Sequence, residues 1–404
     1  MPLPTLPSFE SLDVDNRRVL VRVDFNVPLR GRGESREVAD DTRIRASLPT
    51  IEALLARDAR LIICSHLGRP KGFDPEQSMG PVAGRLAELL KRPVRLPDEV
   101  VGDGVTKLVN DTRAGEIVLL ENLRFHPGEE ANDPEFARAL AKLCDTYVND
   151  AFGASHRAHA SVVGVPALIR VHAPGLLMGA ELHALGRLVD NIERPFVAVV
   201  GGAKVSDKLG ILVALTERLA AGDAIVIGGA MANTFLLARG KELGASLVER
   251  DRMHDCKRVF DKAAARDVRV VLPVDLRCGA ALDSRDAKVI SAEDGVPEGL
   301  RALDIGPRSE AMFAGVIAGA KTLFWNGPMG VFENPAFAAG TMAVAAAVAA
   351  CPGYTVVGGG DSVAALNESG KADAIDHIST GGGASLEFVE GRELPGVVAL
   401  AKVD

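Results

Sequence analysis

Positively charged side chains follow several apolar runs in the first half of the chain, where they could bind an anion. Four are arginines and one is a histidine: Arg43, His66, Arg69, Arg124 and Arg157. A single loop arginine is usually part of a surface ion pair. Several at the ends of neighbouring strands would repel one another unless an anion lay among them, and arginine binds phosphate and carboxylate through paired hydrogen bonds. These residues therefore predict a site for an anionic ligand.

Short polar residues and two further histidines occur in the same half. Asp24 and Asn26 stand at the end of the apolar run that begins at Arg18, where they could bind a small hydroxy acid. His156 and His159 have the i, i+3 spacing of a helical metal-binding pair, but no carboxylate or cysteine motif completes a site. We therefore expect no metal at these histidines.

Glycine clusters follow the apolar runs of the second half. They are Gly201-Gly202, Gly228-Gly229, Asn326-Gly327, Gly358 to Gly360 and Gly381 to Gly383. Glycine lets the backbone approach a ligand closely, and the N–H groups at a helix start can bind phosphate. One such turn has an ordinary structural explanation. Several of them after different strands of one domain predict a phosphate-binding surface.

Two lysines, Lys204 and Lys208, follow the first glycine cluster in the segment GGAKVSDK. Residues four apart share one face of a helix. Two ammonium groups at a helix start conflict with the positive end of the helix dipole. A bound phosphate resolves that conflict, and the alternative is a basic turn that is simply solvated.

Acidic residues near the later glycine clusters could serve a nucleotide. Asp361 and Ser362 follow Gly358 to Gly360, and a carboxylate and a hydroxyl beside free N–H groups suit an Mg²⁺ ion that bridges phosphates. Asp361 could also be only the N-cap of a helix. Glu333 could bind ribose hydroxyls or be an ordinary surface carboxylate.

The motifs of several nucleotide enzymes are missing from the sequence. It contains neither the GxxxxGK[ST] loop of P-loop enzymes nor the HRD and DFG motifs of protein kinases. The GxGxxG pattern of a dinucleotide site is also absent, which disfavours an NAD-dependent dehydrogenase. We therefore expect a phosphate-binding site of another type.

The composition sets the scale of the protein. The chain has 404 residues, of which 47% are hydrophobic, enough for two domains with sizeable cores. Its net charge of -8 gives no general attraction to nucleic acid or membranes, and we expect it to bind neither. The five cysteines have no metal-ligand spacing, and residues 1–10 lack the pattern of a signal peptide, so we predict a cytoplasmic protein with reduced thiols.

Short β-branched runs alternate with helical stretches, which predicts βαβ units with parallel strands. The expected strands are Arg18 to Asp24, Arg60 to Cys64, Glu116 to Leu120, Thr146 to Asn149, Phe196 to Val200, Ala224 to Ile227, Val268 to Leu272, Thr322 to Trp325, Thr355 to Val357 and His377 to Ser379. These runs are continuously apolar, as expected of an α/β protein whose parallel sheets are covered by helices on both faces. Leucine spacing predicts a helix that joins the two halves between Pro174 and Pro195.

Nine segments together resemble the signature segments of the phosphoglycerate kinase family. They are RVDFNVP, DDTRIRASLP, SHLGRPKG, ENLRFHPGEE, NDAFGASHRAHAS, GGAKVSDK, WNGPMGVFE, GGGDS and STGGGASLEF, and they occur in the family's order between Arg18 and Glu390. The resemblance implies two Rossmann-like lobes and a hinge. It implies a substrate domain at residues 1–174, an interdomain helix at 175–194, a nucleotide domain at 195–388, and a C-terminal segment at 389–404 that returns to the first domain.

The same resemblance implies a reaction. A phosphoryl group would pass reversibly, in line and with hinge closure, from 1,3-bisphosphoglycerate to ADP with Mg²⁺, giving 3-phosphoglycerate and ATP. This step belongs to glycolysis and gluconeogenesis or to carbon fixation. Little acid–base chemistry is needed, which suits a site rich in cations and N–H groups. We expect a monomer whose partners are these small molecules.

The resemblance also assigns residues to each ligand. 3-Phosphoglycerate would contact Asp24, Asn26, Arg43, His66, Arg69, Arg124 and Arg157. The nucleotide would lie near Gly202, Lys208, Gly228, Gly229, Asn326, Pro328, Glu333, Gly359, Gly360, Asp361 and Ser362, with Asp361 at the metal. Catalysis would depend on Arg43, Lys204, Lys208 and Gly382.

Two features depart from the family's pattern. Ala230 stands where many members have the third glycine of a triplet, and we infer that this position does not need a positive φ. The segment Asp275 to Asp286 matches no expected pattern, and we assign it no role. The alternative from another class is a two-lobed anion-binding protein without turnover, against which Lys204, Lys208 and Asp361 argue.

Overall fold

The protein, a computed structural model, is described for residues 4–190 and 192–401. Contacts between Cα atoms divide it into two compact units: unit 1 comprises Met1–His183 with Glu393–Asp404, and unit 2 comprises Ala184–Arg392. Residues 1–3 and 402–404, at the ends of the predicted first domain and C-terminal segment, lie outside the described residues. Residue 191 of the predicted interdomain helix does so as well.

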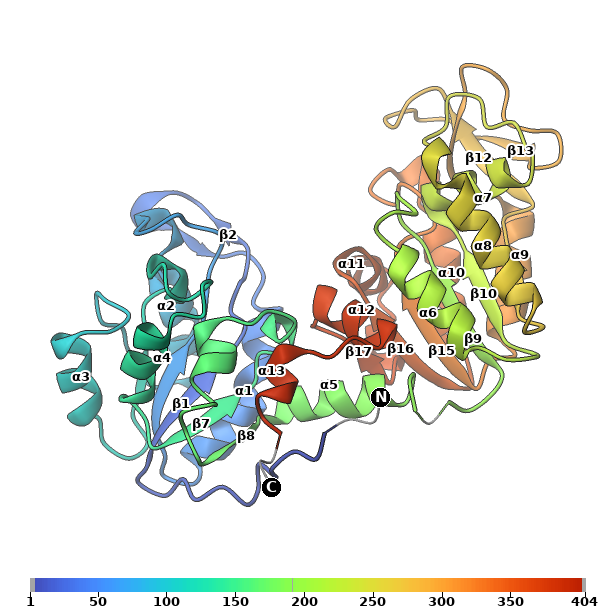
Figure 1. Cartoon of the computed structure of the whole chain (residues 1–404). Coiled ribbons are helices and arrows are strands. Elements are labelled where there is room, and N and C mark those ends of the chain that lie inside the picture. Colours follow the sequence, from blue (N-terminus) through green and yellow to red (C-terminus); the bar gives the residue numbers. More distant parts are fainter. Residues whose placement is uncertain (1–3, 191, 402–404) are drawn as a thin grey trace. The chain divides into compact units, whose positions relative to one another are not determined.

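Unit 1 contains a six-stranded parallel sheet (Figure 1) with the strand order β5-β6-β4-β1-β7-β8. The strands are β1 (Arg18–Arg22), β4 (Arg60–Cys64), β5 (Val94–Arg95), β6 (Ile117–Leu119), β7 (Thr146–Asn149) and β8 (His172–Pro174). The covering helices are α1 (Thr42–Leu55), α2 (Gly80–Leu90), α3 (Asp103–Asn110) and α4 (Pro134–Ala141). A short hairpin of β2 (Leu29–Arg30) and β3 (Glu37–Val38) precedes α1.

Alternate residues of these strands enter two different cores, because successive side chains of a strand point to opposite faces. Val19 and Val21 of β1 pack in one cluster with Ile51 of α1 and Leu86 of α2. Leu20, between them, packs in another cluster that contains residues of α3 and α4. Burial on both faces explains why the strands have continuous apolar sequences rather than alternating ones.

Unit 2 contains a second six-stranded parallel sheet, in the order β11-β10-β9-β15-β16-β17. Its strands are β9 (Phe196–Val200), β10 (Ala224–Ile227), β11 (Arg269–Val271), β15 (Thr322–Asn326), β16 (Tyr354–Gly358) and β17 (His377–Ile378). Its helices are α6 (Leu209–Arg218), α7 (Gly229–Ala238), α8 (Met253–Ala264), α9 (Pro307–Ile317), α10 (Ala339–Ala349), α11 (Gly360–Glu368) and α12 (Gly383–Glu390). The buried Trp325 of β15 packs with residues of α9, α10 and α11 on one face of the sheet.

The predicted α/β class with two helix-covered parallel sheets is confirmed. Each of the ten expected strands is present, with ends within two residues of the prediction. The sequence patterns missed the short strands β5 and β8, which have too few residues to give a periodic signal. They also missed a three-stranded antiparallel sheet of β12 (Asp275–Gly279), β13 (Lys288–Ser291) and β14 (Arg301–Ile305). The segment without a family pattern, Asp275 to Asp286, therefore begins with the central strand of this sheet.

Helix α5 (Leu176–Gly186) lies in the segment predicted as an interdomain helix and is shorter than that segment. Unit 1 caps its first N–H groups. Thr50 Oγ1 accepts from Leu176 over 2.9 Å, and Asp150 Oδ1 accepts from Leu177 and Met178 over 3.0 and 3.2 Å. The start of α5 is thus anchored by side chains of unit 1.

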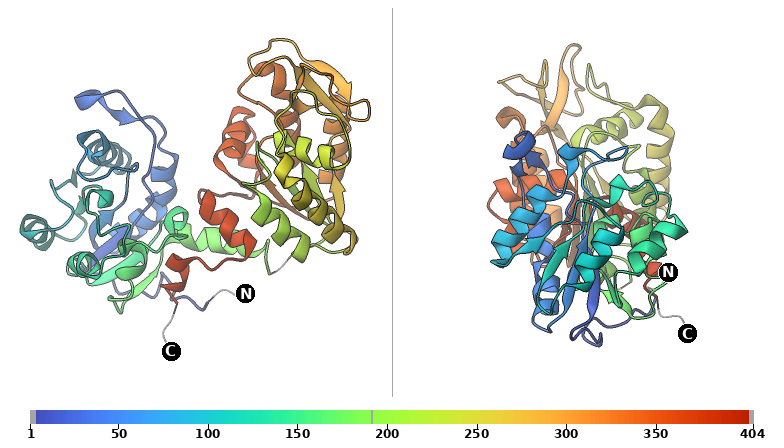
Figure 2. Two further views of the ribbon diagram at one scale, coloured as in Figure 1. Left: turned by 45° about the horizontal axis from the view of Figure 1, so that its top comes forward. Right: turned by 90° about the vertical axis from the view of Figure 1, so that its left-hand side faces the viewer.

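The C-terminal segment packs on unit 1 through α13 (Pro395–Val398), the red helix beside the green elements of that unit in Figures 1 and 2. The N–H of Gly396 donates to the carbonyl of Ser155 over 2.9 Å. Leu400 is buried in the cluster that contains Leu20. Within the described residues, none of the helices combines the length and apolar character needed to cross a membrane.

Candidate active site

The predicted anion-binding residues of unit 1 follow the carboxyl ends of its strands. Asp24 and Asn26 come directly after β1, and His66 and Arg69 follow β4. Arg43 lies in the first turn of α1. Arg124 is in a 3-10 helix after β6, and Arg157 follows one after β7. The parallel sheet therefore brings residues far apart in sequence to one edge, where ligands of open α/β sheets bind.

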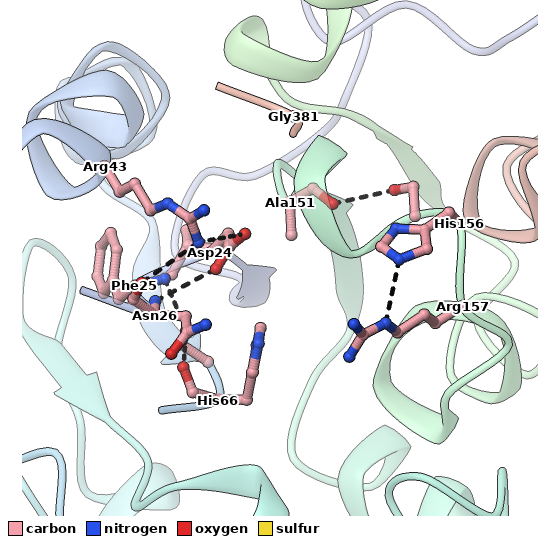
Figure 3. A network of polar contacts seen from close by, with 12 residues as sticks. Asp24, Phe25, Asn26, Arg43, His66, Ala151, His156, Arg157 and Gly381 are labelled. Atoms are coloured by element: carbon pink, nitrogen blue, oxygen red, sulfur yellow. Dashed lines mark hydrogen bonds and ion pairs between the residues drawn. The ribbon is translucent and has the colours of Figure 1, made fainter. Parts of the chain in front are cut away.

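Asp24 and Arg43 form an ion pair at this edge (Figure 3). Nη1 of Arg43 lies 3.0 Å from Oδ2 of Asp24 and also donates to the carbonyl of Asn26 over 3.3 Å. Burial alone would raise the pKa of Asp24, but its electrostatic interactions with His66, Arg43 and Arg22 lower it. The side chain of Arg43 is 37% exposed, so part of its guanidinium faces solvent, where a ligand could reach it.

The turns around this pair are held by buried hydrogen bonds. Ser65 Oγ accepts from the N–H of Phe25 over 2.8 Å, and Asn26 Oδ1 accepts from the N–H of Gly68 over 2.8 Å. Asn122 accepts from the N–H of Leu67 over 3.1 Å. These bonds connect the turn after β1 with the turn after β4, so the positions of Asp24 and His66 are coupled through the backbone.

Arg124 is a cation held largely out of water. Its side chain is only 3% exposed, Nε lies 3.0 Å from Glu130, and Nη1 donates to the carbonyl of Gly68 over 2.5 Å. Burial lowers the pKa of Arg124; Glu130 opposes that effect, and Arg157, Arg22 and Arg69 add to it. The structure thus brings these cations close enough to repel one another. An anion among them would relieve that repulsion.

Arg22 and Ser161 belong to this cluster, although the sequence analysis did not identify them. Arg22 is completely buried at the end of β1, and its Nη2 lies 3.1 Å from Nδ1 of His66. Its Nε donates to Ser161 Oγ over 2.8 Å. The pattern of the run RVLVR predicts only a strand and assigns its last arginine no role. The signal was the charge itself, because arginine is almost never fully buried unless it has partners.

Three glycine-containing turns of unit 2 contact one another beyond the ends of β9, β10 and β15. Gly202 donates its N–H to the carbonyl of Pro328 over 3.0 Å, and Gly229 donates to that of Met329 over 3.0 Å. Gly229 has a φ of +66°, and a Cβ there would overlap the backbone of Gly202. Close backbone packing therefore requires glycine here, independently of any ligand.

A cavity of about 340 Å³ lies beside these turns, within the usual size of ligand pockets. Several residues that the family resemblance assigns to the nucleotide line this cavity: Gly202, Gly229, Pro328, Glu333 and Asp361. Leu247, Leu282, Arg301, Ala302 and Leu303 also line it, and the sequence analysis missed them. Leu247 and Leu282 are 49% and 58% exposed. An isolated leucine in a polar loop, such as the one in AALDSRD, was the sequence feature that could have indicated a ligand contact.

The other predicted residues of unit 2 lie at or after the ends of β9, β10, β15, β16 and β17, but they are not among the described residues that line this cavity. They are Lys204, Lys208, Gly228, Asn326, Gly359, Gly360, Ser362 and Gly382. Gly359 and Gly382 have positive φ values of +91° and +53° and are the N-cap residues of α11 and α12. Ala230 lies in α7 and does not have a positive φ, which confirms the inference made for that position.

Contrary to the prediction, Lys204 and Lys208 do not share a helical face, because α6 begins only at Leu209. Lys204 is exposed in the turn before it, and Lys208 is its N-cap residue. Nζ of Lys208 donates to Oδ1 of Asn326, and Nδ2 of Asn326 donates to the carbonyl of Gly358 over 2.7 Å. Burial lowers the pKa of Lys208, while Asp207, Asp361 and Glu390 raise it. Lys208 thus connects the turns after β9, β15 and β16.

Asp361 is exposed in the first turn of α11 and is not its N-cap, since that position is Gly359. The N-cap alternative is therefore wrong. Ser362 is buried and accepts from the N–H of Gly327 over 2.6 Å, so its hydroxyl holds the turn after β15. No cluster of three or more His, Cys, Asp or Glu that could hold a metal occurs among the described residues. A single carboxylate still fits Mg²⁺, which is commonly bound through one or two carboxylates together with phosphate oxygens and water.

Asp304 of β14 supports the loop that lines the cavity. A Cβ at Gly330 would overlap its carboxyl group. Asp304 Oδ2 accepts from the N–H of Gly340 over 2.7 Å, and Oδ1 accepts from that of Ile305 over 2.9 Å. Burial raises the pKa of Asp304 to about 7, against the lowering effect of these bonds and of Arg277. The carboxyl group therefore changes charge near neutral pH.

Comparisons with known proteins show similarity over nearly the whole chain. The phosphoglycerate kinase family model matches residues 9–392. A phosphoglycerate kinase of Thermomicrobium roseum is 54% identical over 390 residues, 96% of this chain and 97% of that protein. One from Anaeromyxobacter sp. strain Fw109-5 is 52% identical over 398 residues, 98% of this chain and 99% of that protein. The solved phosphoglycerate kinase of Coxiella burnetii has a TM-score of 0.88 at 40% identity and covers 98% of this chain and 100% of its own.

The raised pKa of Asp304 predicts a pH effect on stability. The folded pKa of about 7 lies above the ordinary aspartate value, so the folded state binds a proton that the unfolded state releases. The contribution of Asp304 to the stability of the folded state is complete below about pH 4, and it is lost as the pH rises through about 7. Thermal unfolding of wild type and Asp304→Asn should therefore show a wild-type advantage in Tm that shrinks between about pH 5 and pH 8.

A matched control is Asp294→Asn, which changes an exposed carboxylate of the same unit. The Tm difference between this variant and wild type should stay constant over the same pH range. A constant difference for Asp304→Asn as well would mean that Asp304 is ionised throughout.

Proposed function

This chain belongs to the phosphoglycerate kinase family, and from that premise we propose that unit 1 holds 3-phosphoglycerate and unit 2 holds the nucleotide. The chain has phosphoglycerate kinase activity, a phosphotransfer with a carboxyl group as acceptor that serves glycolysis and gluconeogenesis. The observation that carries the proposed placement is the cluster of cations around the buried Arg124. We also propose that the protein works in the cytoplasm as a monomer.

The anionic substrate lies, in this proposal, among Arg69, Arg124 and Arg157 with His66 beside them. The anion removes the mutual repulsion of the guanidinium groups, and paired N–H groups of arginine match its phosphate and carboxylate oxygens. Asp24 and Asn26 bind the hydroxyl group. Asp24 accepts that hydrogen bond because its lowered pKa keeps it a carboxylate.

The nucleotide occupies, in this proposal, the cavity next to the glycine turns of unit 2. Leu247 and Leu282 cover the base, and Glu333 accepts hydrogen bonds from the ribose hydroxyls. The phosphates lie toward Gly202 and Lys208. Asp361 would hold Mg²⁺, which would neutralise phosphate charge.

The transfer itself needs little proton movement. The bond between the acyl oxygen and phosphorus of 1,3-bisphosphoglycerate breaks while a terminal oxygen of ADP, already an anion, forms a new bond to that phosphorus. Charge spreads over the equatorial oxygens of a metaphosphate-like transition state. Arg43, Lys204 and the N–H groups near Gly382 stabilise that charge, so catalysis consists of positioning and electrostatic stabilisation.

Arg43 and Arg124 provide a test of these roles in a coupled assay of ATP formation. Arg43→Ala should lower kcat by about 10²–10³ with little change in KM for the substrate, because it removes a donor to developing charge. Arg124→Ala should mainly raise that KM, since the buried Arg124 anchors the substrate in ground and transition states alike. Equal effects of the two substitutions on both constants would refute the distinction.

Absence of ATP formation by the wild-type protein would favour a binding protein without turnover.

Lys208→Ala should impair nucleotide binding and turnover together. Lys208 meets a phosphate in both the ground state and the transition state, and a hydrogen bond to a charged group contributes about 1.5–3 kcal/mol. We therefore expect a loss of about 10- to 100-fold in kcat/KM for ADP. The control is Lys257→Ala, an exposed lysine of α8, which should have wild-type kinetics. Wild-type kcat and KM in Lys208→Ala would contradict this role.

Domain closure follows from assigning the two ligands to different units. Phosphoryl transfer needs reacting atoms about 3–3.5 Å apart and aligned, so the units must approach for the reaction and separate for product release. Each anionic ligand screens the cations of its own unit. The radius of gyration from small-angle scattering should therefore fall clearly only with 3-phosphoglycerate and Mg²⁺-nucleotide together. A constant radius at saturation of both sites would show that no closure occurs.

A further inference from the structure

Arg22 is a charged side chain in the core of unit 1, and each of its three nitrogens makes a different contact. Nε donates to Ser161 Oγ over 2.8 Å, Nη1 donates to the carbonyl of Val23, and Nη2 lies 3.1 Å from Nδ1 of His66. Ser161 donates in turn to Oε1 of the buried Glu129 over 2.5 Å. The guanidinium group therefore connects a buried carboxylate with the histidine of the anion site.

The contact between Arg22 and His66 decides where the imidazole carries its hydrogen. A guanidinium group is a donor at every nitrogen, has no acceptor and stays protonated in proteins. Nδ1 of His66 must therefore accept, and the neutral ring then carries its hydrogen on Nε2. A ring turned by 180° would place a carbon atom opposite Nη2 and leave a buried N–H group without this acceptor.

The charges around His66 favour the same state. Burial lowers the pKa of His66 well below its ordinary value, Asp24 opposes this effect, and Arg22, Arg124 and Arg157 add to it. A proton added to Nδ1 would also face an N–H group of Arg22 at hydrogen-bonding distance. His66 is buried at 7% exposure, so water can do little to screen that repulsion.

We propose that Arg22 is a positioning residue that holds His66 neutral with its hydrogen on Nε2, so that this N–H group donates to the anionic substrate throughout the physiological pH range. The identity of the substrate rests on the function proposed above, whereas the position of the hydrogen does not. His66 in this form adds a hydrogen-bond donor to the site without adding a further charge to the repelling cations. It also keeps the substrate affinity independent of histidine titration.

The competing explanation is that Arg22 only balances the buried charge of Glu129. Arg22→Lys separates the two explanations because it keeps the positive charge but has one nitrogen instead of three. A single ammonium group cannot occupy both the Nε position at Ser161 and the Nη2 position at His66. Glu129→Gln is the matched variant, since it changes the buried carboxylate and leaves the contact of Arg22 with His66 in place.

The first experiment is ¹⁵N NMR of the histidine rings in the wild-type protein without substrate. The His66 signals are identified by their loss in His66→Gln, which is needed because the chain has eight histidines. His159, whose pKa burial lowers to about 4, also lies near these arginines and must be assigned separately. We expect an unprotonated Nδ1 and a protonated Nε2 for His66, unchanged between about pH 5.5 and pH 8. A protonated Nδ1, or titration within that range, would overturn the proposal without any use of the variants.

The variants then test the role of Arg22. Arg22→Lys should produce a mixture of His66 tautomers or a titration within the range. It should also raise KM for 3-phosphoglycerate about tenfold, with kcat changed less than about threefold. Glu129→Gln should retain the wild-type His66 signals. If Arg22→Lys keeps the wild-type signals, or if Glu129→Gln shifts them equally, Arg22 has only a structural role. A failure of the wild-type protein to form ATP would refute the proposed function and leave the NMR result untouched.

Discussion

Helices cover both faces of each parallel sheet, so ligands can reach the sheet only beyond the ends of its strands. The chemistry of this protein depends on that constraint. In unit 1 the alternate residues of β1 enter two separate hydrophobic clusters. Polar residues therefore begin where the strand ends, with Arg22 at the boundary and Asp24 and Asn26 beyond it. The same holds for β15 of unit 2, whose last residue, Asn326, bonds to Lys208 and to the turn after β16.

The two units offer different kinds of anion-binding groups. Unit 1 collects guanidinium groups, which are attracted to an anion over a distance but repel one another in its absence. Unit 2 relies more on backbone N–H groups, whose alignment at the starts of helices needs no net charge. Backbone donors require close approach, and Gly202 and Gly229, whose positive φ values of +116° and +66° favour glycine, allow it because they have no side chain. This difference agrees with the proposed placement of 3-phosphoglycerate in unit 1 and of the nucleotide in unit 2.

Much of the fold was predictable because buried parallel strands have a strong local signature. The ten apolar runs correspond to ten of the twelve strands of the two parallel sheets. The antiparallel sheet was not predictable, because β13 is largely exposed and β12 pairs with residues far along the chain. The motifs located the site residues, yet they could not show that Lys208 contacts Asn326 or that Leu282 lines the cavity. Such contacts depend on tertiary packing, which leaves no periodic pattern in the sequence. Arg22 was missed for a related reason, since a strand pattern treats a single charged residue as an exception.

Buried ionisable side chains contact the turns at the strand ends in both units, and this arrangement does not maximise stability. A buried ion pair often contributes no more than apolar residues of the same volume, because desolvation opposes the attraction of the charges. In unit 1 the charges of Arg22 and Glu129 are bridged by Ser161, so each group keeps a partner. In unit 2 Asp304 accepts two backbone N–H groups and still has a raised pKa because of its burial. Apolar residues could fill these positions with less desolvation, but they could not orient His66 or support Gly330. The buried charges are therefore better explained by the precise geometry of the site than by the stability of the fold. Functional sites are where proteins generally depart from the most stable sequence.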